Sequence, residues 1–198
     1  MPKSYCISAE IEGKMAFFAR PDTGASFVSY PAPTYSAVKG MFECVARLKT
    51  TFFRPTHVHV CRPIQFHAYS TNYNGPLRND KNNPYQYKTV VLVDVCYQIF
   101  GVVEEFERHP DFNHRHYLQD KFERRLKRGE IFSTPFLGLK EFVPTYFGPL
   151  RPETTPCANI TETIPAMLLQ VFDKPIDGVF APRFVEAKIE EGVLRYAE

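Results

Sequence analysis

The 198-residue sequence has no tryptophan, no long run of apolar residues and no strong excess of either charge. A membrane-spanning helix needs about 20 consecutive apolar residues, so no membrane partner is expected. The N-terminus also lacks the basic start and apolar stretch of a secretory signal. We therefore expect a soluble, cytoplasmic protein.

Cysteines are few and show no pairing pattern. There are five of them, an odd number, and no CxxC motif occurs. Such isolated thiols are typical of proteins in a reducing compartment without a disulfide framework. The P-loop, GxGxxG and GxSxG motifs are absent as well. The sequence therefore offers no signature of nucleotide cofactors or serine hydrolases.

Positive charge is present but concentrated in one segment. The whole chain has a net charge of +2, whereas residues 114–128 hold six basic and two acidic side chains. Clustered cations indicate contact with nucleic-acid phosphates, although cations at a helix end also offset the helix dipole. The candidates for phosphate contact in this segment and in an earlier helix are Lys39, Arg47, Lys49, Arg124, Arg125, Lys127 and Arg128.

Hydrophobic periodicity predicts two helices. The first is expected from about residue 35 to 49, where apolar residues recur with a period of 3.6 after Thr34, a potential N-cap. The second is expected over 112–128, because Leu118, Phe122 and Leu126 recur every four residues and Gly129 follows as a stop.

Strands are predicted around these helices, and 70–84 is predicted to be a loop. The predicted strands cover 5–11 and 15–19 with a break at Gly13, then 56–66, 89–99 within the stretch 86–106, 132–142, 167–172 and 183–196, the last with a turn at 190–192. The order strand, helix, strand, strand, helix, strand predicts an α+β, ferredoxin-like (RRM-like) domain over 1–148. Residues 149–198 are predicted to form a small β-rich C-terminal extension. Such sheets carry helices on one face and leave the other for a ligand, commonly single-stranded RNA.

Four motifs occur along the chain in a recognisable order. They are AFFARP (16–21), SYPAPTYSAVKG (29–40), FERRLKRG (122–129) and FLGLKEF (136–142). Together they resemble one family, CRISPR-associated protein five in its type I-C (Dvulg) variant, within the RAMP superfamily. The matched blocks cover about residues 1–49 and 113–143.

The resemblance implies metal-independent cleavage of CRISPR repeat RNA without a cofactor. It also implies that the protein stays on the 5′ end of the mature guide, beside other subunits of a type I effector complex. Family members carry a catalytic tyrosine late in the first helix and a Lys-His pair before the second. Here the tyrosine position falls on Ala46, and the pair resembles Arg115-His116, followed by Tyr117. Two alternatives stay open: an endoribonuclease, or a catalytically inactive subunit that caps the guide RNA.

The residues at 115–117 suit cleavage of RNA by its own 2′-hydroxyl, which needs a base, an acid and a stabilising cation. His116 carries an imidazole, a group that can act as acid or base, Arg115 suits a phosphorane, and Tyr117 is a candidate to replace the missing phenol. His114 is a further candidate. The competing structural interpretations are a solvated histidine for His116, a surface cation for Arg115 and a packed aromatic for Tyr117. A cationic surface of this kind also predicts non-specific DNA binding.

A third alternative is a metal-dependent hydrolase. His57, His59 and Cys61 alternate along a predicted strand and would share one face of it. Imidazole and thiolate are metal ligands, but no third or fourth ligand is evident at suitable spacing. We therefore expect no metal site here, and partly buried strand residues are the competing interpretation.

Overall fold

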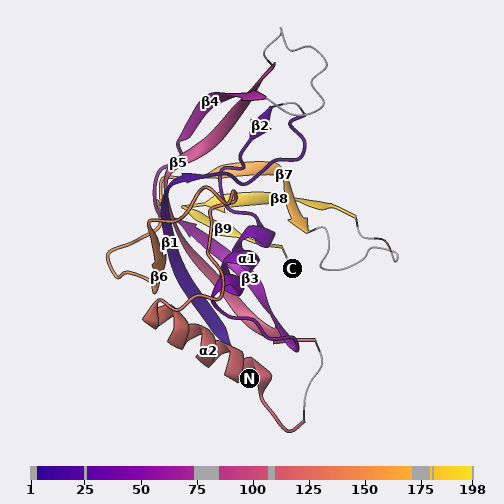
Figure 1. Ribbon diagram of the computed structural model, residues 1–198, viewed down its shortest axis with the longest axis vertical. Helices are drawn as coiled ribbons and strands as arrows, with labels where there is room; N and C mark the ends of the chain where they lie inside the picture. The colour runs from indigo at the N-terminus through magenta and orange to yellow at the C-terminus, as the bar shows by residue number, and fades with distance from the viewer. Residues whose placement is uncertain are drawn as a thin grey trace.

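A computed structural model describes residues 4–24, 26–73, 85–106, 110–170, 179 and 181–197. The described residues form a curled, mostly antiparallel sheet with two helices against one face (Figure 1). Neither described helix has the length and hydropathy that crossing a membrane would require. The elements are β1 (Cys6–Ala16), β2 (Phe27–Val28), α1 (Tyr35–Val45), β3 (Thr51–Val60), β4 (Phe66–Tyr73), β5 (Tyr85–Glu105), α2 (His114–Arg128), β6 (Tyr146–Gly148), β7 (Glu162–Gln170), β8 (Arg183–Glu190) and β9 (Val193–Arg195).

The sheet order confirms the predicted α+β, ferredoxin-like architecture. Its path is β6-β1-β5-β3-β9-β8-β7, and β1, α1, β3, β5, α2 and β6 follow one another as the expected βαββαβ unit. The strand β5 is long enough to pair with β1 and β3 at one end and with β4 at the other. The arm of β4 and the first part of β5 therefore projects away from the two helices (Figure 1).

The core lies between the helices and the sheet. Each helix buries the apolar stripe that its periodicity predicts: Val38, Met41, Phe42 and Val45 in α1, and Leu118, Phe122 and Leu126 in α2. The rings of Phe42 and Phe122 meet edge to face with centroids 5.7 Å apart. Gly101 of β5 makes room for this packing, because a Cβ there would lie 2.8 Å from the Phe42 ring.

The opposite face of the sheet is partly covered by the chain itself. Residues 149–157, here called the strap, cross it, and Arg151 donates to the fully buried Glu10 through its backbone N–H at 2.9 Å and its Nε at 2.5 Å. The Thr154 hydroxyl also donates to Glu10, and Gln98 donates to the Thr154 carbonyl. Burial acts to raise the pKa of Glu10, but the hydrogen bonds from Arg151, Thr154 and Gln98 outweigh it and hold that pKa below its ordinary value. The expectation of an open ligand face is therefore wrong where the strap crosses.

The prediction of a strand at 132–142 is also wrong. The backbone there turns repeatedly, and the three-residue β6 supplies the fourth strand instead. Phe132 and Ser133 donate backbone hydrogen bonds to the Cys44 carbonyl at the end of α1. Gly138 has a φ of +94° and sits against the backbone of Phe17, where no Cβ would fit. The segment thus packs beside α1 without forming a strand, and Leu137 is its fully buried member.

Several predicted boundaries shift. The first helix ends at Val45 rather than 49, β1 runs through Gly13 without a break, and β3 begins at Thr51 rather than 56. Within the predicted loop at 70–84, residues up to Tyr73 belong to β4, and 74–84 lie outside the described residues. The C-terminal strands are confirmed, with the turn between β8 and β9 where it was expected, although 171 and 172 lie outside the described residues.

The C-terminal strands continue the main sheet. β9 pairs with β3 through His57, Val58 and His59, and β8 and β7 follow outward. Strands of the predicted extension are therefore hydrogen-bonded to strands of the ferredoxin-like part. The division of the chain into 1–148 and 149–198 stays a prediction.

Candidate nucleic-acid interface

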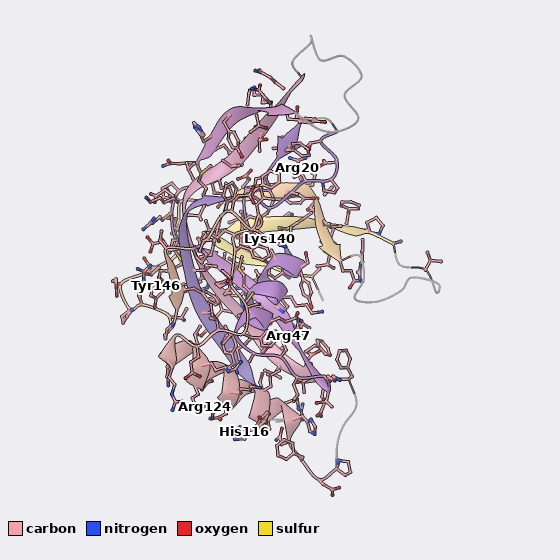
Figure 2. The ribbon with its side chains drawn as sticks, viewed as in Figure 1. Arg20, Arg47, His116, Arg124, Lys140 and Tyr146 are labelled. Atoms are coloured by element: carbon pink, nitrogen blue, oxygen red, sulfur yellow. The ribbon has the colours of Figure 1, made fainter. Side chains whose placement is uncertain are left out.

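Arg115 and His116 lie in the first turn of α2, and Figure 2 shows His116 at the end of the molecule away from the β4–β5 arm. Asn113 caps the helix, and its side-chain oxygen accepts the backbone N–H of His116 at 3.0 Å. The His116 ring is exposed, whereas Arg115 is half-buried. The two side chains are thus held next to each other on a rigid element with one of them open to solvent.

Tyr5 is a candidate that sequence reasoning missed. Its hydroxyl accepts a hydrogen bond of 2.6 Å from the Asn113 side chain, 108 residues further along the chain. The Tyr5 ring lies 5.1 Å from the Arg115 guanidinium and 6.2 Å from the His116 ring. Tyr5 directly precedes β1, and only the pairing of β1 with β5 brings it to this place. No local sequence signal would have indicated it.

The guanidinium of Arg115 keeps hydrogen-bonding capacity. Its Nε lies 3.5 Å from a carboxylate oxygen of Glu105, a contact longer than a good hydrogen bond. Within the described part of the chain, this buried Nε has no hydrogen-bond partner. Arg115 is therefore oriented by the Tyr5 ring and by Glu105, and its unpaired Nε is buried rather than open to a ligand.

Tyr117 and His114 take different positions from the pair. The Tyr117 ring is exposed and packs against Phe112, with centroids 5.8 Å apart, while the Lys121 ammonium lies 5.9 Å from its centroid. His114 bonds to the Thr50 hydroxyl at 2.5 Å through its Nδ1. His114 thereby fastens the first turn of α2 to the connection between α1 and β3. Of the tyrosines near the pair, Tyr5 contacts both of its members.

The predicted basic residues at the end of α2 do not act alike. Arg124 pairs with Asp120 at 2.7 Å, and Arg128 lies 3.8 Å from Glu130. Arg125 turns inward and donates to the Val45 carbonyl at 2.9 Å, so it ties α2 to the end of α1. Lys127 is exposed and forms no ion pair among the described residues. Lys127 is thus the member of this cluster most available to a phosphate.

The remaining predicted cations, Lys39, Arg47 and Lys49, come together in a groove between α1, the start of β3 and α2. This basic groove has a volume of about 430 Å³ and is lined by Lys39, Glu43, Arg47, Leu48, Lys49, Thr51, Phe52, Phe53, Phe106, Leu118 and Phe132. Figure 2 shows Arg47 near the same end of the molecule as His116. Leu118 reaches the lining from α2, the helix that carries Arg115 and His116, but the side chains of that pair are not part of the lining.

Ala46, where the resemblance expects a tyrosine, is fully buried at the C-cap of α1. Its backbone N–H bonds to the Phe42 carbonyl at 3.4 Å, and its conformation is extended. The residue therefore presents no side chain to solvent. The phenol implied by the resemblance is absent at this position.

The alternative of a metal site does not gain support. Within the described ranges, no three His, Cys, Asp or Glu side chains are grouped as metal ligands would be. The His57 ring instead stacks on Phe100 at 4.4 Å, and burial lowers the pKa of His57. The Cys61 thiol contacts the His59 carbonyl at 3.5 Å. These residues are partly buried in or next to β3, as the competing interpretation expected.

Comparison with known proteins identifies the family. The model of the family described as CRISPR-associated protein (Cas_Cas5), in its Cas5d form, matches residues 6–189. The chain belongs to the Cas5 family. This confirms the resemblance found in the motifs, including its type I-C kind. A Cas5 relative from Thermus thermophilus, named CRISPR pre-crRNA endoribonuclease Cas5d, is 30% identical, with 95% of this chain and 90% of the relative covered. A relative of the same name from Mannheimia succiniciproducens is 24% identical over 95% of this chain and 93% of its own.

Solved structures agree with the fold of this Cas5 chain. A CRISPR-associated protein superposes with a TM-score of 0.74 at 18% identity, covering 98% of this chain and 92% of the other. A functionally uncharacterized protein from Streptococcus mutans has the same TM-score at 20% identity and the same coverage. A chain of a CRISPR RNA-guided surveillance complex superposes with a TM-score of 0.54 at 15% identity, covering 92% and 87%. At these identities the likeness is one of fold.

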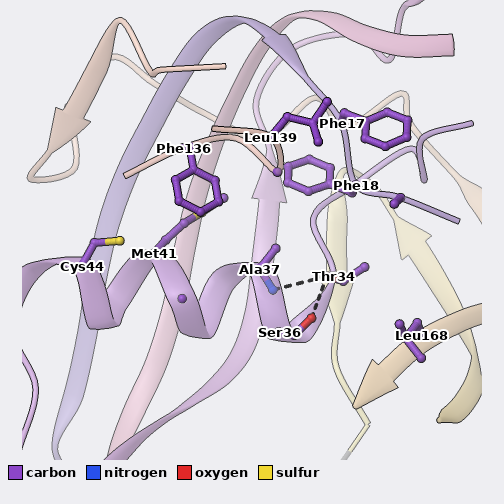
Figure 3. A pocket seen from close by; sticks show the side chains of 13 residues that line it. Phe17, Phe18, Thr34, Ser36, Ala37, Met41, Cys44, Phe136, Leu139 and Leu168 are labelled. Atoms are coloured by element: carbon purple, nitrogen blue, oxygen red, sulfur yellow. Dashed lines mark hydrogen bonds between the residues drawn. The ribbon is translucent and has the colours of Figure 1, made fainter. Parts of the chain in front are cut away.

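Three of the Cas5 motifs meet around a second cavity, of about 390 Å³, which Figure 3 shows. Phe17 and Phe18 come from the first motif, Thr34 and Ala37 from the second, and Phe136 and Leu139 from the last. Phe17 donates to the Leu137 carbonyl at 2.9 Å, and Tyr30 donates to the Phe18 carbonyl at 2.7 Å. The lining is largely apolar and holds none of the predicted RNA-binding cations. These motifs therefore build the scaffold beside α1, while the candidate interface lies elsewhere.

Proposed function

We propose that this chain processes precursor CRISPR RNA as a metal-independent endoribonuclease and then stays on the 5′ end of the guide. The observation that carries the proposal is the pair Arg115 and His116 in the first turn of α2, beside Tyr5 and on a helix that also contributes to the basic groove. The Thermus thermophilus relative named a pre-crRNA endoribonuclease, aligned over nearly the whole chain, supports it.

The chemistry uses a nucleophile that the RNA itself provides. The 2′-oxygen attacks the adjacent phosphorus, a base takes the proton of the 2′-hydroxyl, and the bond to the 5′-oxygen breaks as that oxygen receives a proton. The products are a 2′,3′-cyclic phosphate and a 5′-hydroxyl. His116 is the exposed group suited to proton transfer, and the half-buried Arg115 is the cation suited to stabilise the phosphorane. DNA lacks the 2′-hydroxyl and would not be cut.

The local charge around the start of α2 favours an anion there. The first turn holds no acidic residue but carries His114, Arg115 and His116. Helix N-termini prefer negative charge, and the Glu105 carboxylate lies 3.5 Å from the Arg115 Nε. A phosphate next to Arg115 and His116 would add negative charge at this helix end and accept hydrogen bonds from both side chains.

A second candidate function is a catalytically inactive subunit that caps the guide RNA. The observation that favours it is Ala46, buried at the end of α1 where the family resemblance expects a phenol. Such a subunit would still need the basic groove and Lys127 for binding. In either case we propose that the partners are CRISPR repeat RNA and other subunits of a type I effector complex, in the cytoplasm, with weak non-specific DNA binding as a side property.

The deciding experiment incubates the purified protein with a labelled repeat hairpin RNA in EDTA. The proposal expects one cut that disappears when the nucleotide before the cut carries a 2′-deoxy sugar. It also expects that His116→Asn slows cleavage by about 100-fold or more with unchanged affinity, while His67→Asn, an exposed histidine on β4, has no effect. Tight binding without any cleavage would reject the enzyme and leave the capping function.

A further inference from the structure

The basic groove has features beyond its charge, and they define a ligand more narrowly than an RNA backbone. We infer that the groove holds one unpaired nucleotide next to the cleaved phosphate, with its base stacked on Phe106 or Phe132 and its phosphate held by Arg47 and Lys49. This inference rests on the proposed function, because it takes the ligand to be the repeat RNA.

Exposed aromatic rings are the first observation. Phe106 is 67% exposed and Phe132 is 59% exposed, although both border a groove. Phe52 lies beside Phe106 with ring centroids 4.8 Å apart, so the two rings form a continuous apolar surface. Leaving such rings in water is unfavourable. Proteins that bind single-stranded nucleic acids use exposed aromatic rings as stacking platforms for unpaired bases.

The cations of the groove match such a ligand. Three basic side chains line it against one acidic side chain, Glu43. Among the residues that the structure describes, Arg47 and Lys49 form no ion pair. The Arg47 guanidinium lies 5.0 Å from the centroid of Phe132, and both groups can stack with a base. A ligand that combines a flat apolar ring with negative charge fits this lining better than an apolar side chain of a protein would.

An unsatisfied hydroxyl is an independent observation. Thr51 lines the groove and is only 4% exposed. Its Oγ1 has no hydrogen-bond partner among the described residues. Buried hydroxyls are normally hydrogen-bonded, and those that are not call for an explanation. The sugar and base atoms of a nucleotide would provide the missing partner once the Thr51 side chain turned toward the groove.

The groove is fixed relative to the candidate catalytic pair. The bond of 2.5 Å between Thr50 and His114 joins the edge of the groove to the first turn of α2. Leu118 lines the groove from the same helix that carries Arg115 and His116. In this inference, a nucleotide seated in the groove is joined along the RNA to the phosphate that these two residues would contact. The groove would select repeats in which a base beside the cut is unpaired.

The test uses repeat hairpin RNAs that carry 2-aminopurine at one unpaired position after another. Stacking quenches the fluorescence of this base, so we expect strong quenching by the protein at one position beside the cut. Phe106→Ala and Phe132→Ala are each compared with the wild type. We expect at least one of them to abolish the quenching and to raise the Kd by about tenfold. Phe106→Trp, which keeps a stacking surface, should restore both.

Phe184→Ala is the matched control, because Phe184 is also exposed but lies on β8. It should leave quenching and Kd unchanged, and melting curves should show that all variants are folded. Wild-type protein that cuts the repeat without quenching at any position overturns the groove inference and leaves the proposed function standing. Quenching that needs Phe106 or Phe132, in a protein that never cuts, supports the groove and rejects the enzyme.

Discussion

The guanidinium of Arg115 lies over the ring of Tyr5, 5.1 Å from its centroid. The hydroxyl of the same tyrosine accepts a hydrogen bond from Asn113, the residue that caps α2 and bonds to the backbone of His116. One side chain that precedes β1 thus holds both the cation and the cap that orients the histidine. Tyr5 is a positioning residue for the pair.

We predict that Tyr5→Phe slows cleavage of the repeat RNA by about tenfold while leaving the Kd unchanged. The substitution keeps the ring under Arg115 but removes the acceptor of the Asn113 hydrogen bond. Such a bond contributes about 0.5–1.5 kcal/mol, and about 1.4 kcal/mol corresponds to a tenfold change in rate. Single-turnover rates and Kd values measured in parallel separate the two effects. Tyr117→Phe is the control, since the Tyr117 ring packs on Phe112 and away from Arg115. A larger loss in Tyr117→Phe than in Tyr5→Phe would assign the important phenol to Tyr117 instead.

Arg125 and Lys127 provide a pair of cations that should respond differently. Arg125→Ala removes the donor to the Val45 carbonyl, so we expect the free energy of unfolding to fall by about 1–2 kcal/mol. Lys127→Ala should leave stability unchanged and weaken RNA binding, with the slope of log K against log salt reduced by about 0.7. Urea denaturation and salt titrations of the Kd measure both. If both substitutions weakened RNA binding equally and neither changed stability, the inward role of Arg125 would be contradicted.

The turn at Gly138 predicts a large effect on stability. With φ at +94° and no room for a Cβ beside Phe17, Gly138→Ala should lower the free energy of unfolding by about 3 kcal/mol. Gly40→Ala is the matched control, because a Cβ at this position of α1 meets open space. It should raise the free energy of unfolding by about 1 kcal/mol, the gain from better helix propensity. Thermal or urea unfolding measures both changes. The account would be contradicted if the two substitutions shifted the free energy of unfolding in the same direction.

The strap should make stability depend on acid pH. The pKa values of Glu10 and Glu12 are lowered in the folded protein from an ordinary value of 4.5. Groups of this kind stabilise the fold above their unfolded pKa, and the contribution is lost as the pH falls through the folded pKa. We therefore expect the free energy of unfolding to decline below about pH 4.5.

Arg151→Ala tests the origin of that decline. At pH 7 it should cost about 3 kcal/mol, because a buried carboxylate loses its partner, and the loss of stability below pH 4.5 should become shallower. Arg20→Ala is the control, because Arg20 forms an exposed pair with Asp22 at 2.8 Å, and it should cost less than about 1 kcal/mol. An unchanged acid profile in Arg151→Ala would show that another group is responsible.

The helices were predictable because their signals are local. Leu118, Phe122 and Leu126 follow one another at helical spacing, and the cap and stop residues lie next to them. The segment 132–142 was not predictable in the same way. Its apolar residues suit a strand as well as a packed turn, and only the contact between Gly138 and Phe17, far apart in sequence, decides between them.

The residues of the candidate site also differ in how far local sequence predicts them. Arg115 and His116 are adjacent in sequence and could be found as a pair, and Lys39, Arg47 and Lys49 could be placed near one helix. That Arg125 turns inward to Val45, and that Tyr5 reaches Asn113, depends on how β1, α1 and α2 pack together. Residue type indicates what a side chain can do, whereas its neighbours decide whether it faces a ligand or the interior.

The pairing of β9 with β3 has a consequence for how this protein melts. Removing residues 149–198 would leave the backbone groups of His57 and His59 without their partners on β9 and would strip the carboxylate of Glu10 of its arginine. An unpaired strand border also invites association with other chains. The N-terminal and C-terminal parts are therefore expected to unfold in a single cooperative transition, and a shortened chain ending at 148 is expected to aggregate.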